Sequence, residues 1–280
     1  MKKTNRLLLL AITLLMPGLL LTLSAQKKVE LRYNLTTGDQ YTYNIETDQD
    51  ITFEASGQTM VRNSKIGFEM TGTVNDNASE NIAIKTIIDR VTMTQSIFGM
   101  EIKYDSKDPS TTENPMAAKI AEAFSGLIGS SYTMIMDNKG NVKEVDMSEL
   151  TDNDDLAQNL SSGSNYAIYK DGKVAVGDSW EKDIEPLKTS DMKYHLKYTV
   201  LKISKKETTL GVEGLITANS IDDAEVNLKG TQSGEMIVDT QTGWLIKSVI
   251  DQELTLDIEQ GGQKFPATIS GTTISTSMKK

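Results

Sequence analysis

The stretch MIVDTQTGWLIKSV, residues 236–249, reads as a strand, a tight turn and a second strand. Asp239 suits the start of the turn because its side chain can bond the backbone that follows it. Gly243 accepts the positive φ that a short hairpin loop needs. After the turn, apolar residues recur at every second position, as in a strand with one buried face. This stretch predicts an antiparallel β-hairpin.

The same arrangement occurs earlier in the chain, in MIMDNKGNVKEV at 134–145. Upstream of each hairpin lies a second shared phrase, TTGDQYTYNI at 36–45 and AVGDSWEKDI at 175–184. Both phrases contain Gly-Asp, one further residue and an aromatic residue. Each motif alone is a common turn, but the same two in the same order indicate a duplicated unit of strands. We predict a single β-rich domain at 26–280, built of two related halves at about 36–150 and 175–260.

Apolar and polar residues alternate over most of the chain. This pattern favours an antiparallel sheet with one buried face and one wet face. The alternation slips at Ile87-Ile88 and at Val200-Leu201, where a β-bulge would re-aim the strand and help to bend the sheet. The expected fold is mainly β (α+β), with a large curved antiparallel sheet or half-barrel.

One segment at 114–130, NPMAAKIAEAFSGLIGS, breaks the alternation and predicts an apolar helix over about 115–128. Asn114 suits the cap and Pro115 the first turn. The apolar residues that share one helical face are Met116, Ile120, Phe124, Leu127 and Ile128. Because that face is broad, we expect the helix to pack on the concave face of the sheet. A second, weaker helix is predicted at about 148–160.

The amino terminus has the layout of a secretory signal peptide at 1–25. A basic end is followed by an apolar run and a small residue, Ala25, at the expected cleavage position. A retained membrane anchor is the alternative, but Pro17 and Gly18 interrupt the run and its length is marginal for a bilayer core of about 30 Å. We therefore expect a periplasmic or secreted protein without a stable membrane anchor after cleavage.

Composition excludes several classes of protein. The chain has no cysteine, so disulfides, thiol catalysis and a lipid-anchoring cysteine are absent. The formal charge is −10, and cleavage of the basic leader makes the chain more acidic. An acidic protein is repelled by nucleic acid and by anionic lipid headgroups. We expect neither as a partner.

Catalytic motifs are lacking. His195 is the single histidine and lies out of phase with the apolar residues of its strand, so it is expected to be exposed. The sequence has no Cys-His set for zinc, no Gly-x-Ser-x-Gly elbow, no phosphate loop and no dinucleotide fingerprint. The acidic clusters at 151–156 and 221–225 do not match a calcium loop. We expect no catalytic residue, no metal and no cofactor, although a carboxylate pair formed by folding stays an alternative.

Methionine is abundant, with thirteen in the chain. Its flexible, polarisable side chain fills irregular core space and also lines adaptable binding surfaces. Core filling is the simpler interpretation. If a ligand cavity exists, the candidate lining residues are Met116, Ile120, Phe124, Leu127, Phe68, Met70, Met134 and Met136.

The leader ending in SAQ, the repeated Gly-Asp-x-aromatic entries and the paired hairpins resemble a family of uncharacterised exported bacterial proteins, a domain of unknown function. The hairpin at 236–249 and the apolar helix show a weaker resemblance to lipoprotein-localisation carriers and mycobacterial lipid-binding lipoproteins. That resemblance implies a curved sheet wrapped around helices and an apolar cavity. The chain departs from the lipid-binding lipoproteins because it lacks the lipid-anchoring cysteine, which speaks against an anchored acceptor and leaves a soluble carrier open.

Three hypotheses for function follow. The first is a non-catalytic exported protein that binds or carries an apolar, lipid-like molecule, with the helix as plug or lid. The second is an envelope structural or interaction protein with a solid core, no ligand cavity and a protein partner. The third is a hydrolase that uses a carboxylate pair, for which no motif speaks. We pursue the first because it makes the sharper prediction.

Overall fold

The computed structural model describes residues 27–55, 58–77, 81–97, 99–148, 166–184, 191–221, 224–260 and 263–280. The predicted leader at 1–25 and nearly all of the predicted helix at 148–160 lie outside these ranges. The described helices are a 3-10 helix, η1 (Pro109–Glu113), and one α-helix, α1 (Pro115–Phe124). The described strands are β1 (Val29–Glu30), β2 (Gln40–Ala55), β3 (Gln58–Asp76), β4 (Asn81–Ile97), β5 (Met100–Asp105), β6 (Ser131–Asp137), β7 (Val142–Asp146), β8 (Lys173–Val174), β9 (Ser179–Ile184), β10 (Lys193–Ile203), β11 (Glu207–Ile221), β12 (Ala224–Asp239), β13 (Leu245–Gln260) and β14 (Gln263–Lys279).

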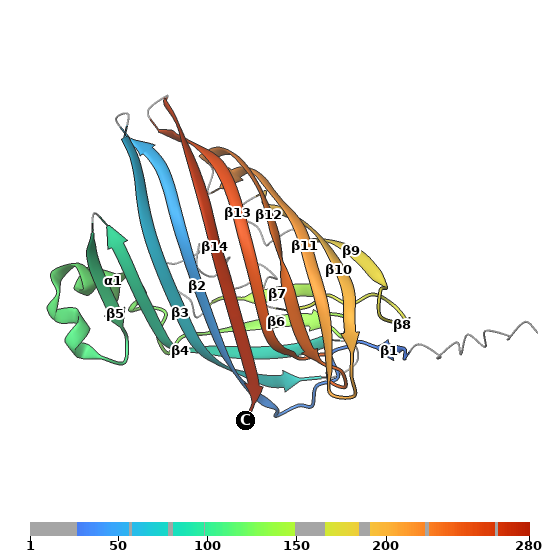
Figure 1. Ribbon diagram of the computed structural model, residues 1–280. Helices are drawn as coiled ribbons and strands as arrows, with labels where there is room; N and C mark the ends of the chain where they lie inside the picture. Colours follow the sequence, from blue (N-terminus) through green and yellow to red (C-terminus); the bar gives the residue numbers. More distant parts are fainter. Residues whose placement is uncertain are drawn as a thin grey trace, which may run out of the picture.

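One antiparallel sheet of 12 strands dominates the molecule (Figure 1). Its order is β7-β6-β4-β3-β2-β14-β13-β12-β11-β10-β9, and β5 also pairs with β4. The last strand, β14, pairs with β2 on one side and β13 on the other, so it joins the amino-terminal strands to the carboxy-terminal ones. β1 and β8 form a separate two-stranded sheet. The predicted curved antiparallel sheet is confirmed.

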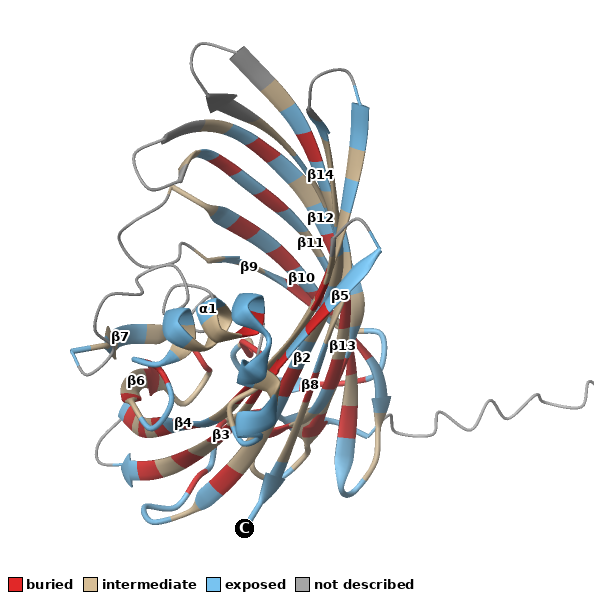
Figure 2. Cartoon of the chain, turned by 90° about the vertical axis from the view of Figure 1, so that its left-hand side faces the viewer, coloured by how far each residue is buried: buried red, intermediate tan, exposed pale blue. Residues whose placement is uncertain are grey.

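Burial alternates along the strands, as the sequence pattern predicts. On β10, Tyr194, Leu196 and Tyr198 are buried, and His195 and Lys197 between them are exposed. Strands with one apolar face bury that face by bending around a shared interior. In Figure 2 the buried residues recur along the curved strands. We call the concave, apolar side the inner face.

Two bulges bend the sheet where the alternation slips. On β10, Val200 pairs with Leu210 and Lys202 with Thr209, which leaves Leu201 as the extra residue. On β4, the register shifts between Ile88 and Arg90, one residue after the predicted position. An extra residue on one strand increases local twist and bending.

The α-helix begins where the sequence predicts and ends earlier. The Asn114 side chain accepts a hydrogen bond from the Met116 N–H (2.9 Å), and Pro115 occupies the first turn. The helix ends at Phe124 rather than near residue 128, because hydrogen-bonded turns carry the chain on to Gly129, whose φ is +82°. Figure 2 shows α1 on the concave side of the sheet. No helix within the described ranges is long and apolar enough to cross a membrane.

The two Gly-Asp phrases fold into the same turn. The Gly38 N–H donates to the Val74 carbonyl (2.8 Å), and the Val74 N–H donates back to the Asp39 carbonyl (2.9 Å). The Gly177 N–H donates to the Val200 carbonyl (2.8 Å), and the Val200 N–H donates back to the Asp178 carbonyl (2.9 Å). Both strand entries are therefore tied to a neighbouring strand by matching bonds. The duplication of the strand unit stays a prediction. Matching bonds of this kind are expected if two halves of the chain share an origin.

Candidate functional site

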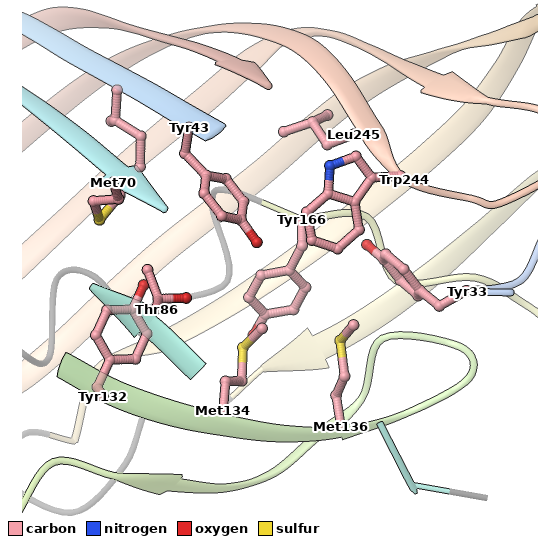
Figure 3. Close-up of a pocket in the computed structure, with 11 residues that line it drawn as sticks. Tyr33, Tyr43, Met70, Thr86, Tyr132, Met134, Met136, Tyr166, Trp244 and Leu245 are labelled. Atoms are coloured by element: carbon pink, nitrogen blue, oxygen red, sulfur yellow. The ribbon is translucent and has the colours of Figure 1, made fainter. Parts of the chain in front are cut away.

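A cavity lies in the interior of the molecule, on the inner face of the sheet (Figure 3). Its volume is about 50 Å³. The side chains that line it are Tyr33, Tyr43, Ile45, Met70, Thr86, Tyr132, Met134, Met136, Tyr166, Trp244 and Leu245. This lining of mainly apolar and aromatic groups with a few polar ones is typical of ligand pockets, although the volume is well below their usual range of about 300–1,000 Å³.

Residues from both halves of the chain line the cavity. Strands β2, β3, β4 and β6 supply residues from the first half, and the turn between β12 and β13 supplies Trp244 and Leu245. The Trp244 ring stacks on Tyr41 at a centroid separation of 4.0 Å. Two further residues, Tyr33 and Tyr166, come from segments outside the large sheet. The cavity therefore exists only when these distant segments have packed together.

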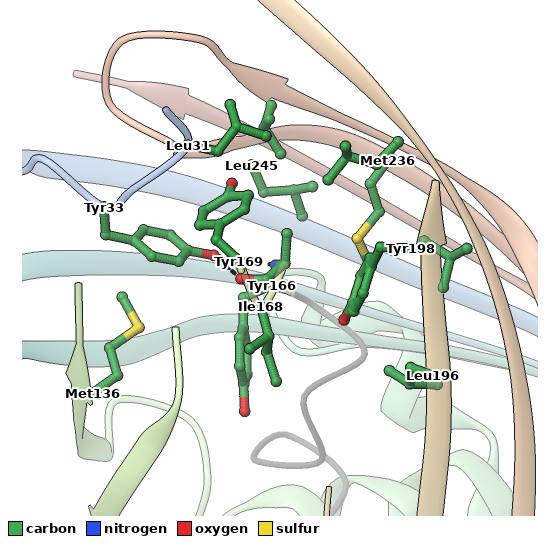
Figure 4. Packing of buried hydrophobic residues seen from close by; sticks show 14 of the residues in the cluster. Leu31, Tyr33, Met136, Tyr166, Ile168, Tyr169, Leu196, Tyr198, Met236 and Leu245 are labelled. Atoms are coloured by element: carbon green, nitrogen blue, oxygen red, sulfur yellow. Dashed lines mark hydrogen bonds between the residues drawn. The ribbon is translucent and has the colours of Figure 1, made fainter. Parts of the chain in front are cut away.

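The segment 166–169, YAIY, is irregular in conformation and almost fully buried (Figure 4). Buried backbone outside a sheet needs other partners for its polar groups. The Tyr33 hydroxyl donates to the Ala167 carbonyl (3.0 Å) and accepts from the Ala167 N–H (3.1 Å). The Trp180 indole donates to the Ile168 carbonyl (2.7 Å). These bonds fix the back wall of the cavity.

The two predicted hairpin turns hold this wall in matching ways. The Tyr33 N–H donates to the Asn138 carbonyl (2.7 Å) in the first turn, and the Asn34 N–H donates to the Thr242 carbonyl (2.9 Å) in the second. Gly140 and Gly243 have φ of +89° and +67°. A Cβ on either would clash with a backbone carbonyl of the packed segments. Glycine is required at both turns, for conformation and for close approach.

No lining side chain carries a charge at neutral pH. Burial raises the pKa of the Tyr132 phenol to about 12, and burial is also the main cause that raises the pKa values of Tyr33, Tyr43 and Tyr166. Desolvation disfavours the phenolate, so these groups remain neutral hydrogen-bonding phenols. The cavity suits an uncharged, largely apolar group.

The predicted lining residues fall into two sets. Met70, Met134 and Met136 line the cavity. Phe68, Ile120, Phe124 and Leu127 belong instead to a cluster packed between the helix and the sheet. Met116 is 49 % exposed on the helix surface. Among the described residues, the cavity wall includes none from α1. The helix therefore does not plug this cavity, because its apolar face is satisfied by β5 and neighbouring inner-face residues.

His195 is exposed on the outer face, as predicted. Its Nδ1 lies 2.7 Å from Asp183 Oδ1, and this hydrogen bond raises the pKa of the imidazole. The two residues pair across strands β9 and β10, away from the cavity. In the described ranges no three carboxylate or histidine side chains are grouped to hold a metal ion.

The aromatic part of the cavity wall is not among the lining residues predicted from the sequence. Alternating Tyr41 and Tyr43 signalled a buried face of β2, and Trp244 lies in the hairpin that predicted the fold. No periodic pattern marks Tyr33 or Tyr166, because both lie in segments without regular alternation. Only the tertiary structure brings these rings together.

Comparison with protein families matches this chain to a "Family of unknown function (DUF6263)". The matched residues are 79–152 and 147–245, which together span more than half of the chain. A comparison with curated proteins gives no match.

Among solved structures, the fold resembles a structure of lipovitellin described for its lipid–protein interactions, with a TM-score of 0.54 and 10 % identity. The similarity covers 87 % of this chain and 25 % of that one, so this chain spans a quarter of the lipovitellin length. The translocator domain of the autotransporter NalP from Neisseria meningitidis matches at a TM-score of 0.25, with 10 % identity over 87 % of this chain and 89 % of that one. An outer membrane channel from Pseudomonas putida F1 matches at 0.25, with 7 % identity over 87 % and 97 %.

Proposed function

This chain belongs to DUF6263, a family of unknown function, and we propose that it binds an apolar, lipid-like molecule in the cell envelope without catalysing a reaction. The observation that carries the proposal is the neutral cavity of aromatic and methionine side chains inside a curved sheet. Binding of an apolar group in a cavity with such a wall is favourable because apolar surface is removed from water.

Further support comes from the fold and the leader. Lipovitellin, whose fold resembles this one, is described for its interactions with lipid. The basic, apolar and small-residue pattern of 1–25 is typical of a cleaved signal peptide, which would deliver residues 26–280 to the periplasm or the exterior. Methionine side chains in the wall, Met70, Met134 and Met136, can adapt to ligands of different shape.

Size limits what this cavity holds. Its volume of about 50 Å³ accepts a small apolar group, such as the end of an acyl chain, rather than a whole lipid. We expect a ligand with one hydrocarbon portion inside and the rest along the inner face.

The alternative is a structural or interaction protein of the envelope. It is favoured by the second cluster, where Phe68, Val91, Tyr104 and Leu127 are buried around the helix and form solid core. In this case the outermost strands of the sheet, β7 and β9, would offer backbone groups to a protein partner.

Native mass spectrometry of residues 26–280, purified gently from a periplasmic extract, tests the proposal. We expect an extra mass that extracts into organic solvent. Met134→Trp should abolish the extra mass because the larger side chain fills the cavity. Met116→Trp is the matched control, on the exposed helix surface, and should retain it. A clean apo mass that persists after incubation with mixed envelope lipids would contradict the proposal.

A further inference from the structure

A row of polar side chains crosses the inner face of the sheet. The pairing registers align Gln232 on β12 with Gln252 on β13, then with Gly271 on β14 and Gln49 on β2. The row continues from Gln49 to Ser64 on β3 and Gln95 on β4. Directly paired residues in antiparallel strands share a face, so all these side chains lie on the side that carries Tyr43 and Ile45.

Several of these polar groups are buried. Gln232, Gln95 and Ser64 are 4 %, 7 % and 4 % exposed. The Gln252 amide donates to the Gln232 carboxamide oxygen (3.0 Å), and the Arg62 guanidinium lies against the Gln95 carboxamide. Buried carboxamides are costly unless they are hydrogen-bonded. Within the described part of the chain, the Gln49 side chain makes no hydrogen bond, and Gly271 beside it contributes no side chain.

These polar residues form a narrow band on the inner face and are not the start of a solvent-exposed strand end. Beyond the row, the next inner-face positions are Leu254, Ile269 and Ile51, paired across β13, β14 and β2. Toward the cavity, Thr47 and Thr273 share a hydrogen bond (3.0 Å). We call the row Gln232, Gln252, Gln49, Ser64 and Gln95 the glutamine band. On β13, β14 and β2 it lies between the apolar positions beyond it and the cavity, and on β3 the next inner-face position beyond it is Arg62.

A buried hydroxyl lies in the same register row as Ile45, which lines the cavity. Ser248 is 1 % exposed, and in the described structure its Oγ has no hydrogen-bond partner. It shares the inner face with Met236 and Ser275, one register row from Thr273. Going along β2 from the cavity, one meets Ile45, then Thr47, then Gln49, which is four residues or roughly 13 Å beyond Ile45.

Charge on this face has one sign. In strands β2–β4 and β9–β14, the described residues that the registers place on the inner face include three charged side chains, Arg62, Lys182 and Lys279. All three are cations, in a chain whose overall charge is −10. A cationic group would be repelled here, whereas a carboxylate or a neutral oxygen group would be accepted.

From this arrangement we infer that the ligand is a single-chain amphiphile with an anionic or uncharged oxygen-bearing head, held by Gln49 and Gln252 on either side of Gly271, with its hydrocarbon chain along the inner face and the end of that chain in the aromatic cavity. The inference rests on the proposed function and names the ligand class. Carboxamides both donate and accept hydrogen bonds, so they can hold a carboxyl, ester or hydroxyl group. The distance from the band to the cavity suits one extended chain.

The test is a calorimetric titration of residues 26–280 with dodecanoate, dodecanol and dodecylamine, which share a chain and differ in head group. We expect dodecanoate and dodecanol to bind at least tenfold more tightly than dodecylamine. Gln49→Leu combined with Gln252→Leu should weaken dodecanoate binding about tenfold, because the head group loses its hydrogen bonds to both carboxamides. Gln40→Leu is the control, exposed on the outer face of the same strand.

The outcomes separate the two proposals. Equal binding of all three probes, or dodecanoate affinity unchanged in the double variant, would overturn the glutamine band as a head-group site while leaving the apolar cavity intact. Absence of binding by every probe, together with a clean apo mass in the preceding experiment, would overturn both. Thermal melts of the double variant and of Gln40→Leu check that each is folded.

Discussion

At the scale of single residues, one ion-pair network links three strands on the outer face. Arg90 on β4 reaches Asp105 on β5 through two bonds (2.8 and 2.5 Å) and Glu69 on β3 through another (2.5 Å). The planar guanidinium suits this bidentate contact. The hydrogen bond from Arg90 lowers the pKa of the Asp105 carboxyl to about 2.

Asp105→Asn should therefore reduce the free energy of unfolding by about 1 kcal/mol at neutral pH. Because the pKa of Asp105 is lower in the folded protein than the unfolded value of 3.8, the ionised carboxylate stabilises the fold fully above pH 3.8. This stabilisation is lost as the pH falls through about 2. The difference between variant and wild type should vanish between about pH 4 and pH 2, as measured by urea denaturation. Glu101→Gln, in the exposed pair with Lys103 on the same strand, should change little. A pH-independent loss for Asp105→Asn would contradict the ion-pair account.

At the scale of elements, the helix α1 completes a hydrophobic core against the sheet and does not line the cavity. Ala117 and Leu127 are buried, and the Phe124 ring stacks on Tyr104 with centroids 6.2 Å apart. The helix contacts β5 and η1, which place it beside the first strands rather than over the tyrosine wall. Helix and cavity therefore occupy different parts of the inner face.

Phe124→Ala should cost about 2 kcal/mol, less than the 3–5 kcal/mol typical of a fully buried ring because this one is half-buried. Ligand binding should stay unchanged, because the ring lies outside the cavity wall. Chemical denaturation and native mass spectrometry measure the two effects. Met116→Ala, on the exposed face of the same helix, provides the comparison and should stay near wild type. If the Phe124→Ala variant is fully folded but no longer carries the extra ligand mass, the helix takes part in binding.

At the scale of the whole molecule, the last strand closes the architecture. β14 pairs with β2 along Tyr41–Phe53 and with β13 along Lys247–Gln260. Contacts between residues this far apart in sequence form only after a large loop closes. The two groups of strands share one inner face because this strand lies between them.

Deletion of 263–280 should leave two long strand edges unpaired, so we expect loss of cooperative thermal unfolding and association into large species. Far-UV circular dichroism and size-exclusion chromatography test this. Removal of Lys280 alone loses two bonds, from its N–H to the Gln40 carbonyl and from its Nζ to Thr71 Oγ1, and should leave a monodisperse, folded protein. A truncated protein that melts cooperatively would mean that the amino-terminal strands fold without β14.

The sequence by itself determined the local features of this protein. Alternation predicted the antiparallel strands, the Asp and Gly positions predicted the hairpin turns, and Asn114-Pro115 predicted the start of the helix. These features depend on neighbours a few residues away, and their patterns are visible along the chain. Methionines on alternating positions also pointed to three residues of the cavity wall.

Only the tertiary structure decided which inner-face residues meet. Tyr33, Tyr166 and Trp244 lie far apart in the chain, and the glutamine band arises from the registers of strands whose order no local pattern fixes. Register follows from the packing of whole faces, so a polar residue such as Gln49 cannot be assigned partners until its neighbouring strands are known. The helix likewise packs against β5 because apolar surface is available there, and this position cannot be predicted from the sequence of the helix alone.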